Sequence, residues 1–364
     1  MSHAGRALGL LLSGLATAGL PQATPAQTLA GKVVAAADGA PLVGTRVTLE
    51  DVAGTLLTTT LTDGRGGFSV PLPNDGAFVV QADRAGFRAS TATVAADSVA
   101  PPVELRLARI VIPLDDLSTD MGKGCRVPAR TAERVAELWN ETRKALAVAA
   151  LVEDQGRLGY QVETWYRHLD PRRLRVLEED RTPHVGFRNT LRHPSPPADE
   201  LAREGYVRGG RPGESLAFYP PDVHTLVSTI FPATHCLGFD GDAPEDGWVG
   251  LRFEPLDEQA MDVEGTLWID ARSYEPRRLE FRYTDLPWPL RTDKVGGGAE
   301  FRRLSDGAII TSRWWLRMPR VGVRQARITQ WAAPTKRYTL AGIVEEGGRV
   351  LRVRTPDGSI EEIR

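Results

Sequence analysis

The chain is poor in cysteine, nearly balanced in charge and, after its first residues, without a long apolar run. Its 364 residues carry a formal net charge of −2, which gives no overall field to attract nucleic acid or an anionic membrane. No later stretch is apolar enough to cross a bilayer, so we expect no integral membrane span. The first of two cysteines is Cys125, which excludes lipid attachment near the N-terminus.

The sequence also lacks the motifs of common enzyme classes. It contains no His-Glu-x-x-His, no Gly-x-Ser-x-Gly and no Walker sequence, and none of its six histidines begins a His-x-x-Glu pair. Asp257, Glu258, Asp262 and Glu264 gather before one strand, but a glycosidase needs two facing carboxylates, and acidic turns are common in soluble proteins. We therefore expect a protein that is not an enzyme and that uses no cofactor and no metal.

The N-terminus has the order of an export signal. Arg6 supplies a positive charge, residues 8–20 are apolar and small, and residues 24–26 offer small side chains for cleavage. The apolar run is short for a membrane span. We expect a signal peptide and a mature chain that begins near Gln27, located in the periplasm or at the cell surface.

Two cysteines in an exported chain indicate a disulfide. A bridge between Cys125 and Cys236 would close a long loop and, in the chain-entropy model, stabilise the fold by about 4–5 kcal/mol. The alternative is a pair of buried free thiols. A zinc site at His224, His235 and Cys236 is the weaker interpretation, because adjacent residues rarely bind the same metal.

The glycine-rich stretch that begins at Asp63 invites comparison with a ligand loop. A calcium loop would need oxygen ligands where Arg65 and Gly67 stand, and a phosphate loop would need Gly-Lys-Ser/Thr before a helix. The glycines lead instead into residues 68–72, which alternate as a half-buried strand does. The stretch therefore predicts a tight hairpin turn with glycine at positive φ, and not a site.

Short alternating strands and turns fill the region around this stretch. About seven strands between residues 27 and 109 predict a β-sandwich of the prealbumin or immunoglobulin type. The pattern resembles the carboxypeptidase regulatory-like domain, through residues 31–33, 38–44, 47–49, 62–68 and 86–87.

This resemblance implies a module that accompanies other domains and does not itself cleave peptides. Such modules recur in exported surface proteins, and the wider fold includes carbohydrate-binding modules, so the resemblance also implies glycan as a ligand class. The aromatic residues of the module are Phe68, Phe78 and Phe87, and each occupies a core-like position. That placement favours packing over a glycan platform.

Residues 110–158 form a predicted connector with one amphipathic helix over 128–151. Pro128 suits the first turn, and Glu141 and Lys144 are spaced for a surface ion pair. One apolar stripe runs along the helix, at Val135, Leu138, Trp139, Thr142, Leu146 and Ala149. Further short helices are expected over 197–204 and 221–231. The arginine-rich and aromatic segment 160–173 is followed by acidic residues 178–180, which cancel its charge and argue against nucleic acid.

Strand signals dominate from residue 248 onward, with short turns that predict an antiparallel meander. The expected turns are 270–272, 305–307 and 346–348. The expected strands are 249–253, 263–269, 277–283, 298–304, 309–318, 326–331, 338–345 and 350–354. With the strand 265–270 and the hairpin 301–307, this meander resembles the open half-barrels of periplasmic lipoprotein carriers, in which a curved sheet holds acyl chains in an apolar trough.

Tryptophans are the candidates for such a trough. Those of the meander either line it or fill the core against the helices, and they are Trp268, Trp288, Trp314, Trp315 and Trp331. Trp314 and Trp315 are adjacent, so they must point to opposite faces of one strand. We therefore take Trp268, Trp314 and Trp315 as the candidate binding surface.

Together these patterns predict a mainly β protein with a signal peptide (1–26), a seven-stranded β-sandwich (27–109), a helical connector (110–158) and an antiparallel sheet with packed helices (159–364). The leading hypothesis is an exported, non-catalytic binding or envelope-assembly protein that contacts an envelope protein or a glycan through its β domains. The alternative is a periplasmic lipid or lipoprotein carrier. The third is a hydrolase, which would need Asp257, Glu264, His224 and His235 to converge in one cleft.

Overall fold

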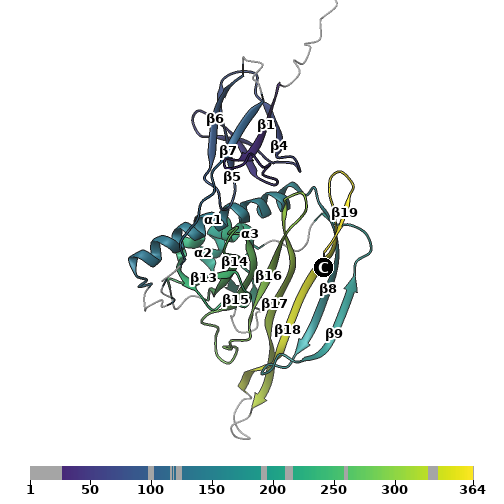
Figure 1. Ribbon diagram of the computed structural model, residues 1–364. Helices are drawn as coiled ribbons and strands as arrows, with labels where there is room; N and C mark the ends of the chain where they lie inside the picture. Colours follow the sequence, from purple (N-terminus) through teal and green to yellow (C-terminus); the bar gives the residue numbers. More distant parts are fainter. Residues whose placement is uncertain are drawn as a thin grey trace, which may run out of the picture.

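The protein is described by a computed structural model that covers residues 27–96, 102–114, 117, 119, 125–189, 195–209, 216–257, 261–326 and 335–363. The expected signal peptide lies outside these residues. The fold is mainly β: a small domain of strands β1–β7 stands on a larger domain with one long helix and a wide sheet (Figure 1). Within the described residues, no helix is both long enough and apolar enough to span a membrane.

The small domain is the predicted seven-stranded β-sandwich. One sheet has the order β4-β1-β7, with β1 (Gln27–Ala35), β4 (Gly67–Leu72) and β7 (Val103–Leu107). The other has the order β3-β2-β5-β6, with β2 (Arg46–Asp51), β3 (Leu56–Leu61), β5 (Ala77–Asp83) and β6 (Ser90–Ala95). Phe68 and Phe78 are buried in the core between the sheets, and Phe87 packs against it. The apolar residues that alternate along these strands therefore point into the core between the two sheets, as their period of two predicts.

The stretch at Asp63 is a turn, as predicted. One oxygen of the Asp63 carboxylate accepts hydrogen bonds from the backbone N–H groups of Arg65 and Gly67, both at 2.8 Å, and Gly66 has φ of 74°. The prediction of a hairpin is wrong, because β3 and β4 belong to different sheets. The glycines let the chain cross from one sheet of the sandwich to the other.

The long helix α1 (Ala129–Gln155) follows Pro128 and ends at Gly156, whose φ of 55° is left-handed. All six residues of the predicted apolar stripe are buried. The helix packs against β12, β13, β15 and β17 of the large sheet. A single hydrophobic core joins its buried side to that sheet.

Within the described residues, ten antiparallel strands form the large sheet, in the order β12-β13-β14-β15-β16-β17-β18-β8-β9, with β19 beside β18. Their bounds are β8 (Gly159–Leu169), β9 (Val176–Pro183), β12 (His235–Asp240), β13 (Trp248–Pro255), β14 (Val263–Asp270), β15 (Pro276–Tyr283), β16 (Gly296–Arg303), β17 (Ile309–Ala326), β18 (Thr335–Arg354) and β19 (Ile360–Glu362). The predicted meander from β13 to β18 is present, and β8 closes onto β18 from far away in the sequence.

Two parts of the predicted meander are wrong. Residues 346–348 are not a turn but lie within β18, which runs without interruption through both strands predicted at 338–345 and 350–354. Strand β17 extends to Ala326, and the rest of the strand predicted at 326–331 lies outside the described residues. The pair Gly347-Gly348 is typical of a turn, but in the sheet it makes room for tryptophan rings, as described below.

Short elements fill the segment between β9 and β12: α2 (Ala198–Glu204), β10 (Val207–Arg208), β11 (Ala217–Phe218), α3 (Val223–Val227) and α4 (Phe231–Thr234). Helix α2 ends before Gly205, as predicted. The prediction of a single helix over 221–231 is wrong, because two short helices, α3 and α4, are present in this part of the chain. Asp222 caps α3 by accepting from the N–H of Thr225, and Pro232 fits only the first turn of a new helix.

Glu141 and Lys144 form the predicted ion pair, but the pair lies between the two domains and not at a free surface. Their side chains are 2.7 Å apart. The Glu141 carboxylate accepts from the N–H of Gly86 at 3.0 Å, and Lys144 donates to the carbonyl of Phe87 at 2.8 Å. Arg109 at the end of the sandwich donates to the carbonyl of Arg272 at 3.2 Å, and the N–H of Ile112, just after the sandwich, donates to the hydroxyl of Tyr274 at 2.8 Å. The sandwich is therefore fixed to α1 and to the β14–β15 turn by directional bonds.

Candidate functional site

The large sheet has two different faces, because successive residues of a strand point to opposite sides. We call the face that shares its core with α1 the inner face. One row of cross-strand neighbours on it runs from β12 to β9 through Phe239, Leu251, Leu267, Leu279, Ala299, Trp314, Gly348, Thr164 and Thr182. The row is apolar as far as β17 and polar on β8 and β9.

The next inner row changes character at the same place. It runs from β13 to β9 through Phe253, Gly265, Phe281, Gly297, Leu316, Glu346, Tyr166 and Asp180. Phe253 and Phe281 belong to the core that the sheet shares with α1. The inner face is thus divided into an apolar half and a polar half that meet near β17 and β18.

A cavity of about 510 Å³ lies at this boundary. Its apolar wall includes Leu279, Phe281, Ala299, Phe301, Trp314 and Leu316 of the sheet. Its polar border includes Thr164, Tyr166, Asp180, Thr182 and Glu346. The segment 218–223 also borders the cavity, and we call residues 218–222 the roof. None of the residues that border the cavity comes from α1.

The roof is held in place by hydrogen bonds from both sides. Ser195 donates its hydroxyl to the carbonyl of Pro220 at 2.7 Å and its N–H to the carboxylate of Asp222 at 3.0 Å. The hydroxyl of Tyr283 donates to the carbonyl of Tyr219 at 2.9 Å. Burial, aided by Tyr206, raises the pKa of Tyr283 well above its usual value, so this donor keeps its proton. The cavity is therefore largely preformed.

The adjacent tryptophans lie on opposite faces. On the inner face, the Trp314 ring covers Gly348, where an added Cβ would collide with the indole. On the other face, which we call the outer face, the Trp315 ring covers Gly298 in the same way. Each ring needs a glycine beside it, because no side chain fits beneath it.

The remaining candidate tryptophans do not join Trp314. Trp268 lies on the outer face, in the row of Arg278 and Arg313, and its Nε1 lies 3.3 Å from the carboxylate of Glu280. Trp288 is 79% exposed in the β15–β16 connection. Trp331 lies outside the described residues. The three candidate residues Trp268, Trp314 and Trp315 are therefore divided between two faces.

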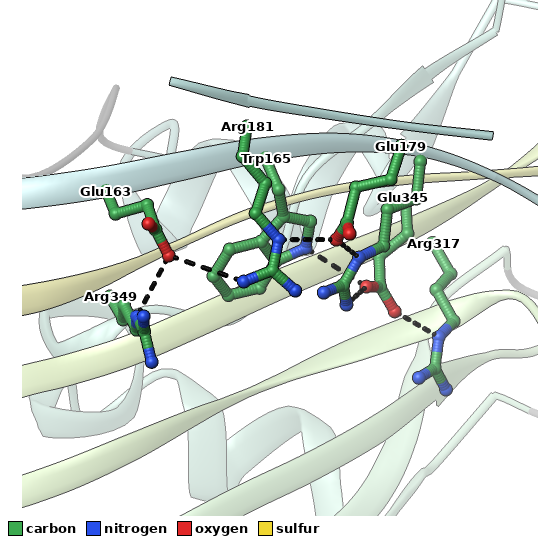
Figure 2. A network of polar contacts seen from close by, with 8 residues as sticks. Glu163, Trp165, Glu179, Arg181, Arg317, Glu345 and Arg349 are labelled. Carbon is green, nitrogen blue, oxygen red and sulfur yellow. Dashed lines mark hydrogen bonds and ion pairs between the residues drawn. The ribbon is translucent and has the colours of Figure 1, made fainter. Parts of the chain in front are cut away.

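The outer face carries a network of arginines and carboxylates around Trp165 (Figure 2). The Glu345 side chain, only 4% exposed, accepts from Trp165 at 3.0 Å, from Arg167 at 2.9 Å and from Arg317 at 2.8 Å. Glu179 is shared by Arg167 and Arg181, and Glu163 pairs with Arg349.

Arginine side chains also stack on the outer tryptophans. Arg313 lies between the rings of Trp165 and Trp315, at 5.6 and 5.7 Å from their centroids. Burial opposes the charge of Arg167, but the hydrogen bonds of Glu179 and Glu345 outweigh it and hold its pKa above the ordinary value. These charges satisfy one another, so the network stabilises the sheet instead of offering a site.

The cysteine prediction is confirmed: Cys125 and Cys236 form a disulfide, with Cα atoms 5.4 Å apart, and it ties the start of α1 to β12. His235 is buried, with its Nε2 3.2 Å from Asp262. His224 is 41% exposed and lies near Asp154. Among the described residues, no three His, Cys, Asp or Glu side chains lie together as metal ligands would.

The carboxylates of the hydrolase hypothesis are dispersed. Glu264 pairs with Arg282 across β14 and β15, and Asp257 is exposed after β13. Glu258 lies outside the described residues. Asp262 faces the buried His235, while His224 lies on α3. Glu264, His224 and His235 thus each have a different partner, in Arg282, Asp154 and Asp262 respectively.

The comparisons with known proteins identify the class of the small domain. Residues 28–108 match the family of the carboxypeptidase regulatory-like domain, which confirms the resemblance and makes this region a non-catalytic β-sandwich. No curated protein matches the chain. A solved structure of the Bacillus anthracis TIE protein is 13% identical over 44% of this chain and 25% of that chain, with a TM-score of 0.20. The match spans a quarter of that protein, and a similarity this low supports no inference about function.

Two parts of the site escaped the sequence analysis. The roof has a visible signal, since Phe218-Tyr219-Pro220-Pro221 combines aromatic rings with prolines directly before a helix. The polar border has none, because Tyr166, Asp180 and Glu346 come from three strands that are brought together only by the pairing of β18, β8 and β9.

Proposed function

We propose that the protein is an exported, non-catalytic binding protein and that its ligand is an amphiphile whose apolar chain lies in the cavity beneath the roof. The supporting observation is the cavity of about 510 Å³ at the boundary of the apolar and polar halves of the inner face. Small-molecule sites occupy roughly 300–1,000 Å³, so the volume is suitable. Among the alternatives from the sequence, this choice favours the lipid carrier. A protein or glycan partner stays a prediction.

The apolar wall supplies the affinity. Phe281, Phe301 and Trp314 lie on the sheet side, and Phe218 and Pro221 lie on the roof side, so a chain between them is enclosed by two surfaces. Each methylene group removed from water contributes about 0.8 kcal/mol. Because the roof is fixed by its hydrogen bonds, little ordering is needed on binding.

A carrier also agrees with the rest of the molecule. The separate partners of His224, His235 and Glu264 support a role without catalysis. The sandwich belongs to a class of accessory module and is bonded to α1 and to the β14–β15 turn, not to the cavity. Location in the periplasm or at the cell surface follows from the proposed signal peptide, and a carrier of apolar chains has its use in that compartment.

Binding of the uncharged probe N-phenylnaphthylamine tests the proposal, because its fluorescence rises in an apolar site. We expect saturable binding to the mature protein, and a Leu316→Trp variant should weaken it at least about tenfold by filling the cavity. Val321→Trp is the matched control: Val321 is on the same strand, 42% exposed and outside the cavity, so binding should be unchanged.

Native mass spectrometry gives a second, independent measurement. Protein purified gently from an exporting cell should retain an adduct that denaturation releases as lipid. The Leu316→Trp variant, purified in the same way, should lack this adduct. Saturable probe binding that survives Leu316→Trp in a folded variant would place the ligand elsewhere. Absence of any probe binding to the wild-type protein would refute the proposed function.

A further inference from the structure

The charged residues that border the cavity all have the same sign. They are Asp180, Asp222 and Glu346, and no Lys, Arg or His occurs among the described residues that border it. Asp222 is occupied, because it caps α3 and accepts from Ser195. Asp180 and Glu346 are exposed at the polar border. The polar end of the cavity is thus anionic.

These two carboxylates are placed on either side of an aromatic ring. Glu346, Tyr166 and Asp180 are direct neighbours in one inner row, and Leu316 precedes them in the same row. Direct cross-strand neighbours have Cβ atoms about 4.5–5.5 Å apart. A ligand with its chain over Leu316 would therefore place its polar end at Tyr166, between the two carboxylates.

The partners of these carboxylates distinguish them from those of the outer face. There, Glu163, Glu179 and Glu345 each bind arginine. For the side chains of Glu346 and Asp180, the described part of the chain offers no hydrogen bond and no ion pair. Among the described residues, neither carboxylate thus has an ion-pair partner at the point where the head of an amphiphile would lie.

Cations near other parts of the border are already engaged. Arg208 stacks on the ring of Tyr219, with its Cζ 4.9 Å from the centroid, but binds Glu200 at 2.6 Å and Glu204 at 2.9 Å. Arg188 contacts His184, which in turn contacts Thr164. Neither arginine borders the cavity. The His168 ring lies edge-on to Tyr166, with the ring centroids 5.3 Å apart, and it does not border the cavity either.

We propose that the ligand is a long-chain amphiphile with an ammonium head group, held between Glu346 and Asp180 and against the face of Tyr166. This inference rests on the proposed function. Two carboxylates attract the cation, and the negative face of an aromatic ring adds to that attraction. A fatty acid of the same chain length would place its carboxylate beside two others, which is unfavourable.

Displacement of bound N-phenylnaphthylamine by hexadecylamine, hexadecanol and palmitate tests the head group, since the three share a chain length. On wild-type protein at neutral pH and low salt, hexadecylamine should displace the probe at a concentration at least about tenfold below palmitate, with hexadecanol between them. Added salt should reduce this ratio, because both carboxylates are exposed.

A double variant, Glu346→Gln with Asp180→Asn, should bring the ratio of amine to acid close to one and leave hexadecanol unchanged. Asp75→Asn with Glu104→Gln removes the same charge from exposed positions of the sandwich and should keep the wild-type ratio. Equal or tighter displacement by palmitate on wild-type protein would overturn the ammonium assignment while leaving the cavity proposal standing. A ratio that falls equally in both double variants would also overturn it, because overall charge would then be the cause. Failure of the probe itself to bind would overturn the proposed function and this inference together.

Discussion

The two faces of the large sheet are built from the same strands by different means. On the inner face, Phe253, Leu267 and Leu279 are buried in the core that the sheet shares with α1. On the outer face, the neighbouring positions carry arginines, carboxylates and tryptophans that bind one another (Figure 2). The inner face is stabilised by removal from water, and the outer face by a network that can remain in water.

The difference explains why a site forms on only one of them. Charges of the outer network are matched within the face, so a ligand would have to displace existing partners. The inner face changes from apolar to acidic across β17 and β18, which leaves a cavity with two unlike ends. An amphiphile fits this change from apolar to acidic. The outer face, whose charges are already paired, offers no such change.

The largest expected effect is the loss of an aromatic side chain from the inner face. Phe253→Ala should lower the free energy of unfolding by about 3–5 kcal/mol, because Phe253 is fully buried against Phe231. Arg252→Ala changes the next residue of the strand on the outer face and should cost no more than about 0.5 kcal/mol. Urea unfolding of both variants checks the pair, and equal losses would contradict the difference between the faces.

An intermediate effect is expected for the buried carboxylate of the outer network. Glu345→Ala leaves Arg167, Arg317 and the indole N–H of Trp165 without their shared acceptor, which should cost about 2–4 kcal/mol. The control is Glu362→Ala, which breaks an exposed pair with Arg352 in the same sheet and should cost at most about 1 kcal/mol. If calorimetry found Glu345→Ala as mild as its control, the network would be only a surface feature.

The smallest effect is expected at the rim of that network. Arg349 is 51% exposed and pairs with Glu163 at 3.0 Å, so Arg349→Ala should cost about 0–1 kcal/mol. Screening should make this loss smaller at high salt. Denaturant unfolding at two salt concentrations measures it. A large loss that salt does not change would mean that Arg349 acts through packing on the sheet instead of through its charge.

Local patterns in the sequence were enough for much of this fold. The stripe of Val135, Leu138 and Leu146 identifies the buried side of α1, because residues three or four apart in the sequence share one face of a helix. Alternation likewise identifies the sandwich strands, and glycine chemistry identifies the turn at Asp63. Where a local pattern predicted the wrong structure, a distant partner was the reason. Gly347 and Gly348 have the composition of a turn, yet they lie in β18 beneath the rings of Trp165 and Trp314.

The same limit applies to the candidate site. The adjacency of Trp314 and Trp315 required opposite faces, but no local pattern tells which face meets the helices. The spacing of Glu141 and Lys144 correctly predicted an ion pair, whereas its place between the domains depends on Gly86 and Phe87 of the sandwich. Glu346 lies more than a hundred residues along the chain from Tyr166 and Asp180, and no sequence signal links it to them.

By itself, then, the sequence determined the buried side of α1, the strands of the sandwich and the class of the small domain, and it favoured a disulfide between Cys125 and Cys236. These features depend on local period, turn chemistry and the number of thiols. Only the tertiary structure decided which strands lie side by side, because the backbone hydrogen bonds between two strands are the same whatever their separation in the sequence. The pairing of β18 with β8 brings Glu346 beside Tyr166, and β9 adds Asp180. The cavity and its acidic end exist because of those two pairings.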